Sequence, residues 1–150
     1  MDAQSNDTSD PLYNEIAPVI RGLGYTVVEL KCRQRQKTLH AVAIIHKDGG
    51  VGLEDCTGVH KAIYPRLEVL RSGVDINLEV SSPGIYRKFK SPREFAIFKG
   101  YGVKILLDGE SEWQKGTIGD VAKNAVCIMS ERGNENIDFS RIRKAKLDDP

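Results

Sequence analysis

The stretch that divides this chain in two runs LEVSSPGIYRKFK from Leu78 to Lys90. It opens with alternating apolar and polar side chains, the period of a strand with one buried face. Pro83 then fixes its own φ, and Gly84 can take the positive φ that the third position of a type II turn requires. We therefore predict a strand that ends in a sharp turn at a junction between two modules, formed by Ser81, Ser82, Pro83 and Gly84.

The composition is that of an ordinary globular protein, with 40% apolar and 29% charged residues among 150. The net charge of +1 gives no overall field for nucleic acid, so any such preference must come from local clusters. No apolar run approaches the roughly 20 residues that span a bilayer, and the polar N-terminus is unlike a secretory signal. We expect a cytoplasmic protein without membrane contact, with reduced cysteines at positions 32, 56 and 127.

Before the junction, the sequence predicts an α+β domain over residues 11–86, preceded by a flexible N-terminus, residues 1–10. Asp10 can cap a helix that has Pro11 at its first position, and glycines after position 21 end that helix. The expected order is helix, strand, strand, helix, strand. That order suits a small sheet with both helices packed on one face.

The sequence makes two further predictions for this domain, a hairpin and a helix that contains a proline. The β-rich runs 25–32 and 39–46 form a hairpin whose loop is residues 33–37. The second helix begins near Leu53, and Pro65 either ends it or kinks it.

For residues 87–150, the sequence predicts a linker and a compact β-barrel preceded by a short helix. Ser91 can cap this helix, with Pro92 at its first position and Glu94 as the capping-box partner. Phe95 and Phe98 anchor the helix. Short β-type runs follow at the spacing of a small barrel, at residues 103–107, 113–121, 125–129, 136–139 and 142–147.

The sequence offers no support for catalysis. It contains no phosphate-cradling or nucleophile motif, and His40, His46 and His60 have no obvious carboxylate partner. Cys56 and His60 are one helical turn apart, but two further metal ligands are not marked, so a buried cysteine beside a surface histidine is the better interpretation. We expect neither an enzyme nor a cofactor.

Basic side chains are more informative, because they cluster in three places. Between Tyr86 and Lys104 six basic residues stand against the single acid Glu94, a pattern that suits contact with phosphate backbones. A solvated face explains any one cluster, whereas three together favour a nucleic-acid or ribonucleoprotein partner. The other two clusters are Lys31, Arg33, Arg35 and Lys37 on the hairpin, and Arg141, Arg143, Lys144 and Lys146 on the last strand.

Several motifs resemble those of the bacterial ribosome maturation factor RimP family. They are the 78–84 strand and turn with Arg87, the Ser91-Pro92 helix with its two phenylalanines, Gly100-x-x-Val103-Lys104, Gly24-Tyr25 with Val28-Glu29, and Leu53-Glu54-Asp55-Cys56. The resemblance implies an N-terminal α/β domain and a C-terminal Sm-like, SH3-type barrel. It also implies a monomeric, non-catalytic factor that assists late assembly by binding the immature small (30S) ribosomal subunit, through rRNA and a ribosomal protein near the decoding region.

On this basis we expect the rRNA phosphates to be contacted by Arg87, Lys88, Lys90 and Arg93, while the junction turn sets the domain geometry. The family usually continues S-S-P-G-x-D-R-P-L, and here Tyr86, Lys88 and Phe89 replace the Asp, Pro and Leu. This predicts a linker that is more basic and less rigid than usual.

Two other functions stay open at this point. An RNA-binding regulator of Sm type, acting off the ribosome, predicts a ring of six or seven copies. An enzyme on the N-terminal domain, with a phosphatase-like activity, predicts dependence on His40, His46 or Arg35.

Overall fold

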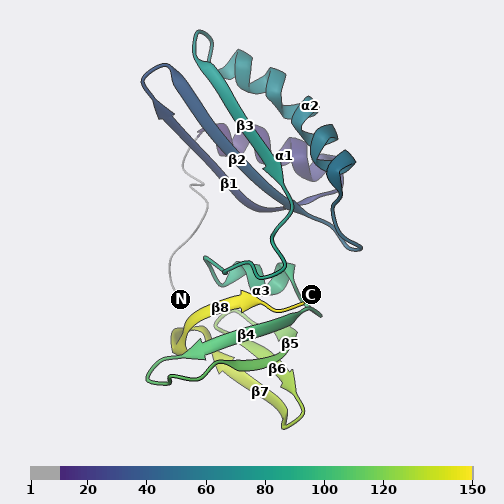
Figure 1. Cartoon of the computed structure of the whole chain (residues 1–150), viewed down its shortest axis with the longest axis vertical. Coiled ribbons are helices and arrows are strands. Elements are labelled where there is room, and N and C mark those ends of the chain that lie inside the picture. The colour runs from purple at the N-terminus through teal and green to yellow at the C-terminus, as the bar shows by residue number, and fades with distance from the viewer. Residues whose placement is uncertain (1–10, 150) are drawn as a thin grey trace. The chain divides into compact units, whose positions relative to one another are not determined.

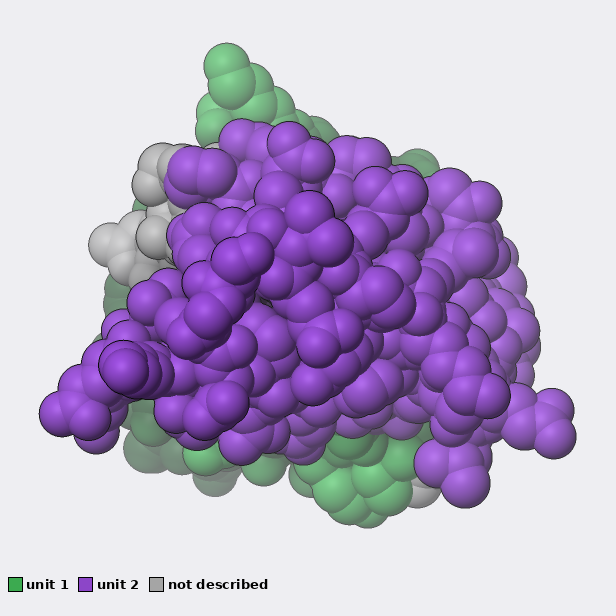
Figure 2. All heavy atoms as spheres, turned by 90° about the horizontal axis from the view of Figure 1, so that it is seen from above, with its two compact units in different colours: residues 1–4, 84–150 green, residues 5–83 purple. Residues whose placement is uncertain are grey.

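The computed structural model describes residues 11–149, which divide between Pro83 and Gly84 into two compact units (Figure 1; purple and green in Figure 2). We call them the N-terminal unit and the C-terminal unit. The predicted flexible N-terminus and the Asp10 helix cap lie outside the described residues. Helices and two separate sheets confirm the predicted α+β class.

The N-terminal unit is a three-stranded sheet with two helices on one face (Figure 1). The strand order is β1-β2-β3, with β1 and β2 antiparallel and β2 and β3 parallel. A parallel pair needs a crossover connection, and α2 supplies it. The elements follow in the predicted order: α1 (Pro11–Gly22), β1 (Thr26–Arg35), β2 (Thr38–His46), α2 (Leu53–Leu70) and β3 (Asp75–Ser81).

Side-chain periodicity decides which faces are buried in this unit. In β3, Ile76, Leu78 and Val80 pack against the core while most residues between them are exposed, which confirms the predicted alternation. Ile16 of α1 and Ile63 of α2 are fully buried in the same core. Each such side chain contributes about 1.5–3 kcal/mol to stability.

Two local predictions need correction. Residues 33–35 belong to β1, so the hairpin turn takes only Gln36 and Lys37, and Gln36 has the positive φ of 55° that two-residue hairpin turns favour. Of the two alternatives at Pro65, the helix end at Tyr64 is wrong, because α2 continues through the proline as one element of 18 residues. Its buried face extends to Leu67 beyond the proline, so packing against the sheet holds both halves.

The C-terminal unit is a curved, five-stranded antiparallel sheet preceded by a short helix (Figure 1). All five predicted runs are strands, and the fourth starts three residues earlier than predicted, at Gly133 rather than position 136. The strand order is β7-β6-β5-β4-β8. The elements are α3 (Arg93–Ile97), β4 (Gly102–Leu107), β5 (Gln114–Val121), β6 (Ala125–Ser130), β7 (Gly133–Asp138), the 3-10 turn η1 (Phe139–Arg141) and β8 (Ile142–Leu147).

The junction does not form the predicted type II turn. Gly84 does not have a positive φ, and the hydrogen-bonded turn lies two residues later, where the Arg87 amide donates to the Gly84 carbonyl at 3.0 Å. A Cβ built at Gly84 would meet nothing within 4 Å. The residues Ser81 to Gly84 therefore lead out of β3, and residues 84–87 make the turn.

Because neither space nor φ requires glycine at position 84, Gly84→Ala should leave the free energy of unfolding unchanged or raise it by up to about 1 kcal/mol. Urea unfolding followed by circular dichroism measures this. A loss of more than about 1 kcal/mol would show that the turn has another geometry.

Candidate nucleic-acid interface

Glu94 fixes the start of the C-terminal unit through three contacts. Its Oε1 lies 2.6 Å from Arg87 Nε, and the two side chains are 0% and 7% exposed, respectively. Its Oε2 accepts hydrogen bonds from the amides of Lys90 at 2.8 Å and Ser91 at 3.3 Å. The Ser91 contact is the predicted bond from Glu94 back to the helix start. The predicted cap by Ser91 is wrong, because α3 begins at Arg93, after Pro92, and none of the described side chains caps it. Glu94 thus ties residues 87–91 to α3.

This arrangement separates Arg87 from the other residues expected to contact phosphate. The Arg87 side chain is buried beside a carboxylate, so its charge already has an internal partner. Lys88, Lys90 and Arg93 are exposed. Sequence reasoning treated the four cations alike because the burial of one of them depends on tertiary packing.

The segment after the turn is attached to the edge of the sheet. The Leu147 amide donates to the Arg87 carbonyl and the Phe89 amide to the Ala145 carbonyl, both at 2.8 Å, which places Lys88 opposite Lys146. These bonds flank the pair, so the Lys88 amide takes no part in the ladder.

Phe89 anchors this segment from the inside. Its ring is 7% exposed and lies 4.9 Å from that of Phe95 and 5.5 Å from that of Phe98, centroid to centroid. From Arg87 onward, the expected linker is therefore packed against the C-terminal unit.

A row of four lysines crosses the outer face of this sheet. Lys115 of β5 stands opposite Lys104 of β4, Lys104 opposite Lys146 of β8, and Lys146 opposite Lys88. Residues directly opposite each other in antiparallel strands project from the same face. Val103 and Ile105, on either side of Lys104 in the chain, are buried, so the lysine row lies on the outer face.

Two other groups lie beside the lysine row. The Lys146 ammonium is 4.8 Å from the centroid of the Trp113 ring, which is 38% exposed. At the other end, Lys115 Nζ lies 3.9 Å from Asp148 Oδ2. Sequence reasoning assigned Lys104 and Lys146 to different clusters and did not single out Lys115 or Trp113, because their alignment depends on strand register.

The hairpin cluster lies on the N-terminal unit. Lys31, Arg33 and Arg35 are exposed on β1, whereas Leu30 before them and Cys32 between the first two pack on the core. The three cations therefore face away from the helices. Lys31 also lies 3.6 Å from the buried carboxylate of Glu29.

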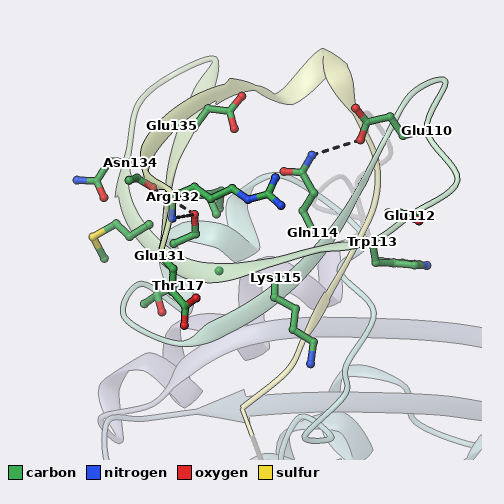
Figure 3. A pocket seen from close by; sticks show the side chains of 15 residues that line it. Glu110, Glu112, Trp113, Gln114, Lys115, Thr117, Glu131, Arg132, Asn134 and Glu135 are labelled. Atoms are coloured by element: carbon green, nitrogen blue, oxygen red, sulfur yellow. Dashed lines mark hydrogen bonds between the residues drawn. The ribbon is translucent and has the colours of Figure 1, made fainter.

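A pocket of the C-terminal unit has mixed charge and does not suit a polyanion (Figure 3). Gln114 and Arg132 extend toward each other across it, and Gln114 Nε2 donates to Glu110 Oε2 at 3.2 Å. Lys115 and Trp113 point away from its centre. Four glutamates line this pocket, at positions 110, 112, 131 and 135.

Asp55 of the N-terminal unit accepts hydrogen bonds from three residues. One of its carboxylate oxygens accepts hydrogen bonds from Tyr25 Oη at 2.5 Å and Lys47 Nζ at 2.9 Å, and the other accepts from the Gly52 amide at 2.8 Å. The hydrogen bonds from Lys47, Tyr25 and Gly52 hold the pKa of Asp55 well below its usual range. These contacts explain Asp55 as a capping residue that joins the residue before β1, the β2–α2 loop and α2.

The lowered pKa predicts acid sensitivity. The contribution of Asp55 to stability is complete above the unfolded carboxyl pKa of about 3.9, and it is lost as pH falls through the lower folded-state pKa. Asp55→Asn should therefore lower the thermal midpoint at pH 7 and flatten its decline below pH 4. Thermal melts from pH 2 to 7 measure both effects. Glu68→Gln, an exposed carboxyl change on α2, is the control, and an equal midpoint for both variants would contradict the prediction.

The histidines and thiols do not form a reactive cluster. His46 is buried and its pKa is lowered by that burial, while His60 stacks on Tyr64 with ring centroids 5.5 Å apart. Within residues 11–149 no group of three or more His, Cys, Asp or Glu side chains could hold a metal, and Cys32, Cys56 and Cys127 are free thiols. None of the helices described has the length and apolar character to cross a membrane.

Comparison with known proteins covers both units. Residues 15–86 match the family model described as the RimP N-terminal domain. The ribosome maturation factor RimP of Borrelia turicatae is 31% identical over 136 residues, covering 91% of this chain and 93% of the relative. That of Borrelia garinii subsp. bavariensis is 30% identical over 142 residues, covering 94% and 96%. With such identity along nearly its whole length, the chain belongs to the RimP family.

Proposed function

We propose that this chain is a ribosome maturation factor that binds the immature small (30S) subunit and assists its late assembly without catalysis. The observation that carries the proposal is the similarity to proteins named ribosome maturation factors over more than 90% of both chains. Exposed basic side chains on both units support rRNA as part of the binding surface.

In this proposal, Lys88, Lys90 and Arg93 contact rRNA phosphates. Their exposure supports this assignment. Arg87 positions them instead of binding phosphate itself, because its ion pair with Glu94 holds residues 87–91 against α3.

The two units act as two domains joined at Ser81, Ser82, Pro83 and Gly84. Two linked weak sites raise the effective concentration of each other on one ribonucleoprotein surface, so useful affinity does not need a deep pocket. Together the two domains contact rRNA and a ribosomal protein near the decoding region, in the cytoplasm.

Deletion of the gene tests the proposal. Sucrose gradients should show fewer mature small subunits and unprocessed small-subunit rRNA ends, and the purified protein should cosediment with free small subunits. A plasmid copy carrying Lys90→Glu and Arg93→Glu should rescue poorly, whereas Lys61→Glu, on the exposed side of α2, should rescue fully. Normal subunits and mature rRNA ends after deletion, with no cosedimentation, would contradict the proposal.

The proposal also predicts a monomer of 16.7 kDa in solution. Light scattering coupled to size-exclusion chromatography measures the mass. A stable hexamer or heptamer would favour a regulator of Sm type in its place.

A further inference from the structure

We infer that the lysine row, together with Trp113, binds the phosphate backbone of single-stranded RNA without reading its sequence. The lysine row consists of Lys88, Lys104, Lys115 and Lys146. The inference deepens the proposed function and rests on it for the identity of the natural ligand as rRNA. It extends the binding surface from α3 across three strands of the sheet.

The four lysines of the row bring like charges close together. Neighbouring strands lie about 4.8 Å apart, so the fold holds the four lysine side chains side by side. Like charges directly opposite each other destabilise a sheet. In the part of the chain that the structure describes, the single ion pair of the lysine row is that of Lys115 with Asp148. Phosphate oxygens would offset the repulsion among the other three lysines, Lys88, Lys104 and Lys146.

The positive charge of the lysine row is arranged along a line. The row runs across the strands, and its four members span about 14 Å, three strand spacings. A single nucleic-acid strand carries one negative charge per nucleotide along its backbone, so a row of this length can meet more than one successive phosphate. Lys144 adds a further charge, because it stands two residues from Lys146 on β8, opposite Leu106 of β4, and is exposed.

Trp113 favours RNA over an acidic protein. Base stacking on an exposed aromatic ring beside a basic track is a common way to hold single-stranded nucleic acid, and it tolerates any base. Here the half-exposed indole ring lies within 4.8 Å of the Lys146 ammonium. An acidic peptide would use the same ammonium groups but has no base to stack on the indole ring.

Fluorescence anisotropy with a labelled 20-nucleotide poly-uridine RNA tests the inference in the full chain, from 50 to 300 mM KCl. The variant Lys104→Gln with Lys146→Gln removes the centre of the row, and Lys61→Gln with Lys123→Gln removes two exposed lysines elsewhere. We expect the first variant to bind about 10- to 30-fold more weakly at 100 mM salt, with a log–log salt slope shallower by about 1.4. Equal affinity and slope in the two variants would overturn the inference, as would no RNA binding by the natural chain.

The thermal midpoint of the row variant, Lys104→Gln with Lys146→Gln, should match or exceed that of the wild-type chain, because the substitutions relieve repulsion between lysines.

Trp113 is the single tryptophan of the chain, so its fluorescence reports on this site, and poly-uridine should quench that fluorescence. Unchanged fluorescence on saturation would overturn the stacking role. Polyglutamate bound as tightly as RNA, with the same lysine dependence, would overturn the RNA assignment in favour of an acidic protein.

Cosedimentation with free small subunits separates this inference from the proposed function. If the natural chain binds small subunits and the row variant behaves like its control on both subunits and RNA, the inference fails and the function stands. If the natural chain binds poly-uridine through the lysine row but not small subunits, the proposed function fails and the RNA surface stands.

Discussion

Replacing Glu94 with alanine should lower the free energy of unfolding of the C-terminal unit by about 3–5 kcal/mol, the usual cost of breaking a buried ion pair. The substitution removes the carboxylate from a guanidinium that is 7% exposed. It also removes the acceptor of the Lys90 and Ser91 amides at the start of α3. Urea unfolding of the full chain, followed by circular dichroism, measures the loss.

Arg87→Met gives a graded comparison. It also breaks the ion pair, but the Glu94 carboxylate keeps both amide donors, so the loss should be smaller than for Glu94→Ala. Glu131→Ala, which truncates an exposed acid in the same unit, should change the free energy of unfolding by less than about 0.5 kcal/mol. A Glu94→Ala protein as stable as the Glu131→Ala control would contradict the structural role of the pair.

Gly116→Ala should destabilise the same unit by about 1–3 kcal/mol through overpacking. A Cβ at this position would lie 2.4 Å from Ile128 Cγ2 and 2.9 Å from the Met129 carbonyl oxygen. Ile128 is β-branched and buried, and the carbonyl belongs to the paired strand β6, so neither neighbour yields easily. For a unit of this size, each 1 kcal/mol lost lowers the thermal midpoint by about 4–8 °C.

Gly84→Ala is the matched control, because it adds the same methyl group where nothing lies within 4 Å. The thermal midpoint of Gly116→Ala should fall well below that of Gly84→Ala. Equal midpoints would show that β5 and β6 separate without cost at this point.

The fold was predictable wherever a local pattern met a single packing face. Alternation in β3, the apolar side of α1 and the short β-type runs after Gly102 each determined an element within a few residues. Pro65 could not be interpreted in the same way. A proline inside a helix costs a hydrogen bond, and only the packing of Leu67 beyond it decides whether the helix continues.

The candidate site was less accessible to sequence reasoning, because it depends on register and burial. Nothing local distinguishes Arg87, which is buried beside Glu94, from Lys88, which is exposed one residue later. The turn at Gly84 was misplaced for a similar reason, since the hydrogen bond to Arg87 depends on docking of the following segment to β8. Lys115 and Lys146 become neighbours of Lys104 only when three strands align.

The position of β8 also has a consequence for synthesis. This strand lies between β4 and the segment at Lys88, so the first part of the C-terminal unit to be made pairs with the last. The N-terminal unit can complete its own sheet as soon as β3 has emerged from the ribosome. In the C-terminal unit, β4 keeps an open edge until residues 142–147 have been translated. This unit is therefore exposed to edge-to-edge aggregation through most of its own synthesis.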